Sequence, residues 1–363
     1  MTIYLDYQAT TPIAPEARLA MLPWIEDKFA NPHSSHVPGR EAAATVALAR
    51  DAVARLLPKG GRVYFTGGAT EAINWGMRCT VSGAIMAAET EHAAVRDTAL
   101  WLEQSPRDVS FFPVEQDGLV DAGLHIAPGT GMVAVMQVNN EIGVVQPVAA
   151  LAEAAHKAGA MFFCDAVQGF GRLDIPEGPD LISVSAHKIH GPKGIGALWV
   201  RDGIEITPLL FGGGQEGGLR SGTLSPALCA GFGAAANVAR QRQAEDAEHV
   251  AMLWDLVMDM LPSDWIVNGS TAMRYKGNLN LRRDGLDAPR LISEVREVAF
   301  SAGSACASGS GRLSHVLRAI GLSESEARSS IRLGFGRYTT PAELREGLRL
   351  IFAAADNQQA LPA

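Results

Sequence analysis

A lysine stands just beyond a segment that resembles a buried strand. Residues 181–185 form a short apolar run, typical of a strand that is buried on both faces, and Lys188 follows it after two residues. A glycine-rich turn then leads to a second predicted strand at 195–200. Lysine prefers solvent, so Lys188 is either a side chain that extends to water or an amine held in a partly dry site. The second alternative suits an amine that forms a Schiff base with a carbonyl cofactor.

Three other polar residues, His92, Asn140 and Asp165, also lie where predicted strands end. In a mostly parallel α/β sheet, ligands bind beyond the carboxyl ends of the strands. We therefore expect these residues and Lys188 to form one site.

Two glycine-rich segments are candidate phosphate contacts. Gly67 and Gly68 lie between a predicted strand at 63–66 and a predicted helix from Glu71. The N–H groups at that helix start, together with the Thr70 hydroxyl, would suit a phosphate. An ordinary tight turn with Thr70 as helix N-cap explains the same residues. The second segment, 211–223, is either a flexible connector or a second phosphate contact.

Alternation of strand and helix patterns predicts an α/β fold with a mostly parallel sheet. From about residue 244 the pattern changes and predicts a second, smaller domain. The predicted strands are 63–66, 84–88, 109–114, 132–138, 161–165, 181–185, 195–200, 278–281 and 330–334. The predicted helices are 15–29, 40–57, one from 71, 148–158, one after 226, 244–261, 288–297, 313–321 and one from 341.

Of the four cysteines, Cys306 has the most unusual surroundings. The others, Cys79, Cys164 and Cys229, fit the usual behaviour of cysteine as a buried, inert side chain. No Cys-x-x-Cys pair occurs, which argues against a disulfide framework or a zinc knuckle and fits a reducing cytoplasm. Around Cys306 the chain offers only small residues, so we expect a mobile loop with an accessible thiol, a candidate nucleophile.

Composition excludes several other classes of protein. With 363 residues, 47% of them hydrophobic, the chain is long enough for a large core. A net charge of −8 argues against nucleic acid or an anionic membrane as the main partner. We see no secretory signal and no apolar stretch long enough to span a bilayer. No Gly-x-Gly-x-x-Gly follows the first long strand, which sets aside a Rossmann-type dehydrogenase.

Eight short motifs, in this order, resemble those of the cysteine desulfurases, which are class V aminotransferases of the fold-type-I pyridoxal-phosphate group. The resemblance covers nearly the whole chain. The motifs are T-G-G-A-T-E (66–71), T-E-H (90–92), V-N-N-E-I-G (138–143), D-A-V-Q (165–168), S-A-H-K (185–188), R-S-G-T (220–223), G-S-A-C (303–306) and S-I-R (330–332). The implied fold is a large domain (12–245) with a seven-stranded, mostly parallel sheet flanked by helices. A smaller α+β domain (1–11 and 246–363) would carry the catalytic cysteine loop, at about 300–312.

The resemblance also implies a role for each site residue. Lys188 would bind pyridoxal 5'-phosphate covalently and shuttle protons. Asp165 would pair with the ring nitrogen, Gln168 with the phenolic oxygen, and His92 would stack on the ring as an acid–base group. The phosphate would be held by Ala69, Thr70, Ser185 and His187, with Thr223 reaching the phosphate of the other subunit in a homodimer. The substrate carboxylate would bind Asn140, which also borders the cofactor, and Arg332.

The implied reaction converts L-cysteine to L-alanine and leaves a persulfide on Cys306. The thiolate is the reactive form of cysteine, and a mobile loop would carry the sulfur to an acceptor or scaffold protein. The length of the loop resembles the branch that feeds iron–sulfur cluster assembly. We expect no resident metal, although Cys306 is a possible transient iron–sulfur ligand. Rival functions are a selenocysteine lyase or another class V enzyme that does not need Cys306, and a non-catalytic sulfur or metal carrier.

Overall fold

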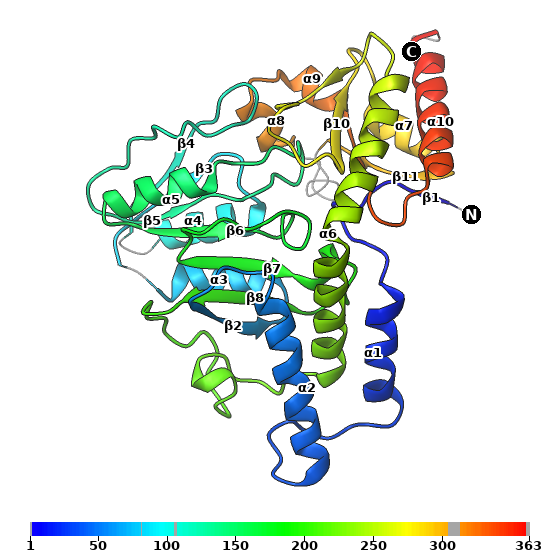
Figure 1. Ribbon diagram of the computed structural model, residues 1–363. Coiled ribbons are helices and arrows are strands. Elements are labelled where there is room, and N and C mark those ends of the chain that lie inside the picture. The colour runs from blue at the N-terminus through cyan, green and yellow to red at the C-terminus, as the bar shows by residue number, and fades with distance from the viewer. Residues whose placement is uncertain (1, 81, 105–106, 304–312, 361–363) are drawn as a thin grey trace.

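The computed structural model describes residues 2–80, 82–104, 107–303 and 313–360 (Figure 1). Cys306 and most of the predicted cysteine loop lie outside these residues. The helices are α1 (Pro15–Glu26), α2 (Val37–Ala54), α3 (Ala69–Arg78), α4 (Ala93–Glu103), α5 (Val148–Lys157), α6 (Pro226–Met260), α7 (Ala288–Glu294), α8 (His315–Ala319), α9 (Glu324–Arg328) and α10 (Pro341–Ala360), with the short 3-10 turns η1 (Ala186–Lys188) and η2 (Glu216–Gly218). The strands are β1 (Ile3–Tyr4), β2 (Gly61–Thr66), β3 (Ala84–Ala88), β4 (Val109–Phe112), β5 (Thr130–Ala134), β6 (Met161–Asp165), β7 (Leu181–Ser185), β8 (Gly196–Arg201), β9 (Ile266–Val267), β10 (Asn278–Arg282), β11 (Val298–Ala299), β12 (Ser301–Ala302) and β13 (Ser330–Gly334).

A seven-stranded sheet in the order β2-β8-β7-β6-β5-β3-β4 forms the centre of the larger part of the molecule. Its pairs are parallel except for β8, which is antiparallel to both of its neighbours. All five residues of β7 are buried, as its short apolar run predicts. The predicted α/β class and mostly parallel seven-stranded sheet are confirmed.

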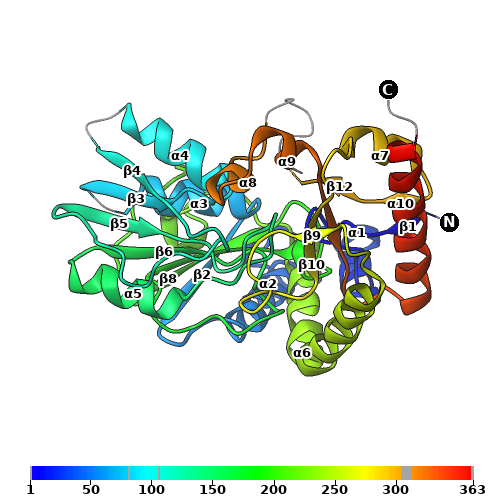
Figure 2. The ribbon, with the colours of Figure 1, turned by 90° about the horizontal axis from the view of Figure 1, so that it is seen from above.

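Helices cover both faces of this sheet. One face packs against α3 and α4, and the other against α2, α5 and α6, which Figure 2 shows as two layers with the sheet between them. A second, antiparallel sheet has the order β12-β13-β10-β9, and its own hydrophobic core includes side chains of α7 and α10. The first strand, β1, pairs in parallel with β11 and so attaches the start of the chain to this second core.

The longest helix, α6, corrects one prediction. The pattern predicted a new helix beginning at about residue 244, whereas α6 runs without interruption for 35 residues. Its first half packs in the core of the large sheet, and its last turns pack in the second core. The polar stretch between the two cores contains neither glycine nor proline, so the helix continues although its apolar face is interrupted. The predicted domain boundary at 245 falls within this helix, and it stays a prediction.

Other differences lie mainly at the ends of elements. α1 ends at Glu26 rather than at 29, and β5 ends at Ala134 rather than at 138. Helices α4 and α9 and the short strands β1, β9, β11 and β12 were not predicted. Two-residue strands carry too little sequence signal, because they are defined by a distant partner. Across the described residues, no helix is both long and apolar enough to cross a bilayer.

Candidate active site

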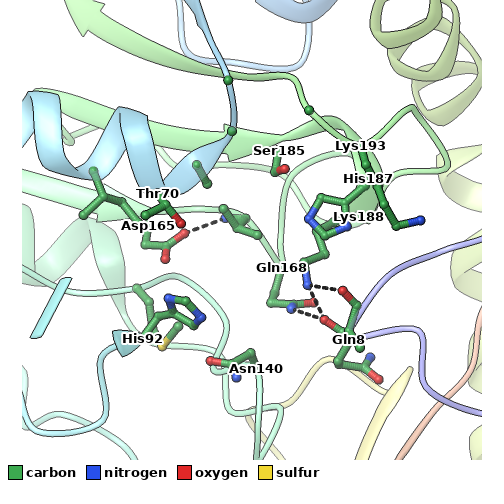
Figure 3. A pocket seen from close by; sticks show the side chains of 18 of the residues that line it. Gln8, Thr70, His92, Asn140, Asp165, Gln168, Ser185, His187, Lys188 and Lys193 are labelled. Atoms are coloured by element: carbon green, nitrogen blue, oxygen red, sulfur yellow. Dashed lines mark hydrogen bonds between the residues drawn. The ribbon is translucent and has the colours of Figure 1, made fainter. Parts of the chain in front are cut away.

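A cavity of about 500 Å³ opens beyond the carboxyl ends of β6 and β7 (Figure 3). Ten of the predicted site residues line it, although they come from segments far apart in the chain. They are Ala69, Thr70, His92, Asn140, Asp165, Gln168, Ser185, His187, Lys188 and Arg332. The lining does not include Thr223, which is exposed on the loop before α6. Cys306 lies outside the described residues.

The amine of Lys188 is held by the backbone of the N-terminal segment. η1 ends at this lysine, directly after β7, and its Nζ donates hydrogen bonds to the carbonyls of Gln8 and Ala9, the latter at 2.9 Å. Thr11 adds a further contact between the N-terminal segment and η1, because its hydroxyl donates a hydrogen bond to the His187 carbonyl at 2.9 Å. Gln8 and Ala9 contribute carbonyl oxygens rather than side chains, so no residue pattern indicated them.

Asp165 presents a buried carboxylate to the cavity. Only 3% of the residue is exposed, and Oδ1 accepts hydrogen bonds from the Val167 N–H at 3.0 Å and the Ser183 hydroxyl at 3.3 Å. Burial raises the pKa of Asp165, and the nearby His92 partly offsets this rise. A protonated ring nitrogen placed against the carboxylate would compensate for its loss of hydration.

His92 is held in one tautomer by a helix start. It is the N-cap of α4, and its Nδ1 accepts a hydrogen bond from the Ala94 N–H at 3.1 Å. The proton of the neutral ring therefore lies on Nε2. Burial lowers the pKa of His92, Asp165 raises it and Lys188 lowers it further, so the imidazole is neutral near pH 7.

The start of α3 forms a pocket of backbone N–H groups. Its N-cap is Gly68, which provides no side-chain hydrogen bond to the helix start. The alternative that makes Thr70 the N-cap is therefore wrong, since Thr70 is the second residue of the helix. A Cβ on Gly196 would lie 2.9 Å from the Ala69 nitrogen, so this glycine allows β8 to pass close below the helix start. Phosphate oxygens are the natural acceptors for such N–H groups.

Burial keeps His187 neutral beside this pocket. It lowers the pKa of His187 to about 4, and the adjacent Lys188 contributes to the shift. Nδ1 of this ring lies 3.1 Å from the Thr10 hydroxyl.

Arg332 and Asn140 both line the cavity and come from different parts of the fold. Arg332 is 1% exposed and pairs with Asp6 at 2.7 Å, and Nη1 donates to the Asn140 carbonyl at 3.0 Å. β13 supplies the arginine, and the loop after β5 supplies the asparagine. A guanidinium fixed in this way offers a directional cationic group in the cavity that Lys188 also lines, and it suits a carboxylate.

Glu141 gives the site a pH-dependent link to α8. Its carboxylate accepts a hydrogen bond from Ser314, the N-cap of α8, and burial raises the pKa of Glu141 to about 7 from its usual 4.5. The folded protein therefore retains a proton that the unfolded chain loses. Its free energy of unfolding falls as the pH rises from about 4.5 to 7, by ~1.4 kcal/mol per pH unit at most.

We expect Glu141→Gln to remove this dependence, because glutamine keeps an oxygen for Ser314 but cannot ionise. The quantity to compare is the free energy of unfolding of the variant minus that of the unsubstituted protein. This difference should be roughly 2 kcal/mol more favourable to the variant at about pH 8 than at about pH 5. Urea denaturation at the two pH values measures the gain. Glu153→Gln, at an exposed residue on α5, is the control. If the free energies of unfolding of Glu141→Gln and the unsubstituted protein differ by the same amount at both pH values, the assignment is contradicted.

Together these groups fit pyridoxal phosphate. One cavity offers N–H groups for a phosphate, a buried carboxylate for a ring nitrogen, a neutral imidazole and a lysine amine. No cluster of His, Cys, Asp and Glu suited to a metal ion was found in the described parts of the chain.

Comparisons with known proteins agree with this arrangement. The family model for aminotransferase class-V matches residues 3–346. Cysteine desulfurase IscS of Rickettsia bellii is 42% identical over 97% of this chain and 90% of its own length. The corresponding protein of Rickettsia rickettsii is 42% identical over 99% and 93%.

Solved structures show the same fold. A NifS-like protein from Rickettsia africae superposes with a TM-score of 0.89 at 28% identity, over 98% of this chain and all of its own. SspA in complex with cysteine gives a TM-score of 0.82 at 34% identity, over 93% of this chain and all of its own. The chain therefore belongs to the aminotransferase class-V family of pyridoxal-phosphate enzymes, in its cysteine desulfurase group.

Proposed function

We propose that this protein converts L-cysteine to L-alanine in the cavity around Lys188, with the sulfur left as a persulfide on Cys306. The observation that carries this assignment is the convergence of Lys188, Asp165 and His92 in one cavity of a chain that is 42% identical to cysteine desulfurases. In the overall step the C–S bond of cysteine breaks and a S–S bond forms on the enzyme. Cysteine and the Cys306 thiol become alanine and the Cys306 persulfide, with no other oxidant or reductant.

Each residue around the cofactor site has its own chemical role in the proposed reaction. Bound pyridoxal phosphate supplies an electron sink for bond changes at the substrate carbon. Asp165 keeps the proton on the ring nitrogen, because its carboxylate is buried and needs a cationic partner. The Lys188 amine moves a proton at the substrate Cα, and the neutral His92 takes up or returns a proton through Nε2. Gln168 donates an N–H to the phenolic oxygen.

Phosphate binding is assigned to the walls nearest α3. We assign the phosphate to the N–H groups of Ala69 and Thr70 and to the side chains of Thr70, Ser185 and His187.

The substrate carboxylate is assigned to Arg332 and Asn140. Arg332→Lys should raise the KM for cysteine roughly 10- to 100-fold with a smaller change in kcat, because lysine lacks the fixed fork of the guanidinium. Steady-state alanine release measures both constants. Arg282→Lys is the matched control. Arg282 lies on β10, in the same small sheet as Arg332, and pairs with Glu326 of α9, but it lies outside the cavity. A KM that stays unchanged in Arg332→Lys would remove the arginine from the substrate site.

A homodimer with shared sites would explain why Thr223 is exposed and does not line the cavity of its own subunit. This residue is exposed near an ion pair of 2.7 Å between Arg220 and Glu71, which ties its loop to α3. Two large apolar side chains, Phe29 and Phe211, are 97% and 85% exposed, as expected for surfaces that a second subunit covers. We assign Thr223 to the cofactor phosphate of the partner subunit. The proposed locale is the cytoplasm, and the proposed sulfur acceptor is a scaffold protein of iron–sulfur cluster assembly or of another sulfur-containing cofactor.

The test is a paired assay of alanine and protein-bound persulfide after addition of L-cysteine, with and without a candidate acceptor. We expect one persulfide per alanine in the first turnover, followed by transfer to the acceptor. Alanine without persulfide would favour a selenocysteine lyase or a related enzyme. A preparation that stays colourless with added pyridoxal phosphate would favour a sulfur carrier.

A further inference from the structure

Arg172 lies directly behind the cavity and contacts two of its residues without lining it. Its Nη1 donates to Oε1 of Gln168 at 2.9 Å, and its Nη2 donates to the backbone carbonyl of Lys188 at 2.7 Å. The guanidinium also lies 5.3 Å from the centre of the Tyr275 ring. Its partners are amide and carbonyl oxygens, so its charge is not neutralised by these contacts. Arg172 borders a second cavity of about 230 Å³, which Lys188 and Tyr275 also line.

The Gln168 side chain is fixed in one orientation by two contacts. Its Nε2 donates to the Gln8 carbonyl at 3.0 Å, while its Oε1 accepts from Arg172 (Figure 3 shows the first contact). A flipped amide would place its NH₂ against the guanidinium and its oxygen against the carbonyl. Because Gln168 is only 4% exposed, water cannot relieve either mismatch. Each lost hydrogen bond would cost ~1–3 kcal/mol.

We propose that Arg172 is a positioning residue that locks the Gln168 amide with its N–H edge toward the cofactor oxygen. This inference rests on the proposed role of Gln168 at that oxygen. Without Arg172, only the Gln8 carbonyl opposes the flipped amide, so the flipped form gains population and the N–H donor is presented less often. Both the N–H donor and the nearby positive charge stabilise the deprotonated form of a bound chromophore. Loss of Arg172 therefore favours its protonated form.

The experiment is a pH titration of the visible absorption of the holoprotein. Arg172→Met should raise the titration midpoint by about 0.5 pH unit or more. Arg172→Lys, which keeps the charge and one of the two paired donors, should raise it less. Arg201→Met is the matched control, because Arg201 also donates to backbone carbonyls, those of Gly178 and Pro179, but lies outside the cavity. Its midpoint should not move.

A double substitution separates action through Gln168 from a general effect. In a Gln168→Ala background, Arg172→Met should shift the midpoint by less than half of its effect in the unsubstituted protein. A full additive shift, or no shift in Arg172→Met while Gln168→Ala moves the midpoint, would overturn the positioning role. If Gln168→Ala itself leaves the midpoint unchanged, the proposed contact of Gln168 with the cofactor fails instead. If Arg172→Met does not fold, the midpoint of Arg172→Lys decides.

Discussion

Lys188→Ala should reduce the rate of alanine release from cysteine by roughly 10⁴-fold or more. In the proposed function the lysine is both the covalent anchor of the cofactor and the base at the substrate carbon, and each role alone contributes a large factor. Among the described residues, the only other lysine that lines the cavity is Lys193, and its side chain is exposed. Steady-state assays of alanine with added pyridoxal phosphate measure the loss.

The control for Lys188→Ala is Lys157→Ala on the outer surface of α5. Lys157 pairs with Glu153 at 2.6 Å, both side chains are largely exposed, and neither lies in the cavity. Its removal should leave alanine release within about twofold, because exposed ion pairs contribute little to stability. Retention of more than a few per cent of the activity in Lys188→Ala would contradict the catalytic role of this lysine.

The second large effect is expected at Cys306, the proposed sulfur acceptor within the enzyme. Cys306→Ser should lower alanine release at least ~10³-fold while the yellow colour of the bound cofactor remains. Serine cannot accept the sulfur, because its hydroxyl is a far weaker nucleophile than a thiolate. The reaction would stop before the C–S bond breaks. Alanine and persulfide are measured together with the visible spectrum.

Cys79→Ser provides the matched comparison for Cys306→Ser. Cys79 is partly exposed, whereas Cys164 and Cys229 are buried, and burial raises the pKa of each of these two thiols. We therefore expect Cys79→Ser to behave as the unsubstituted protein. Unchanged alanine release in Cys306→Ser would instead support the class V enzymes that do not need this cysteine.

Strand ends made most of the site predictable from the sequence. Asp165 ends a short apolar strand and Lys188 closely follows another, and a parallel sheet brings such positions to one edge. The family motifs then pointed to Gln168 and Arg332, which contact segments far away in the chain, Gln8 and Asp6 respectively. The residues that sequence reasoning missed act through the backbone or behind the cavity. Gln8 contributes its carbonyl, and Arg172 contacts the site from outside, so neither left a recognisable pattern.

The continuous helix α6 shows why element boundaries were harder to predict. Its polar middle section joins two cores, and only the three-dimensional arrangement shows that both apolar halves belong to one helix. The pairing of β12 with β13, and of β1 with β11, likewise depends on segments far apart in the chain. Local propensity cannot specify such contacts.

The most direct test of the central claim is to locate the cofactor on the chain. Holoprotein is treated with borohydride, digested and analysed by peptide mass spectrometry. We predict the pyridoxyl phosphate mass on Lys188, in near-stoichiometric yield and absent from Lys188→Ala. The same mass on Lys193, or on no peptide of a protein that binds the cofactor, would contradict the assignment.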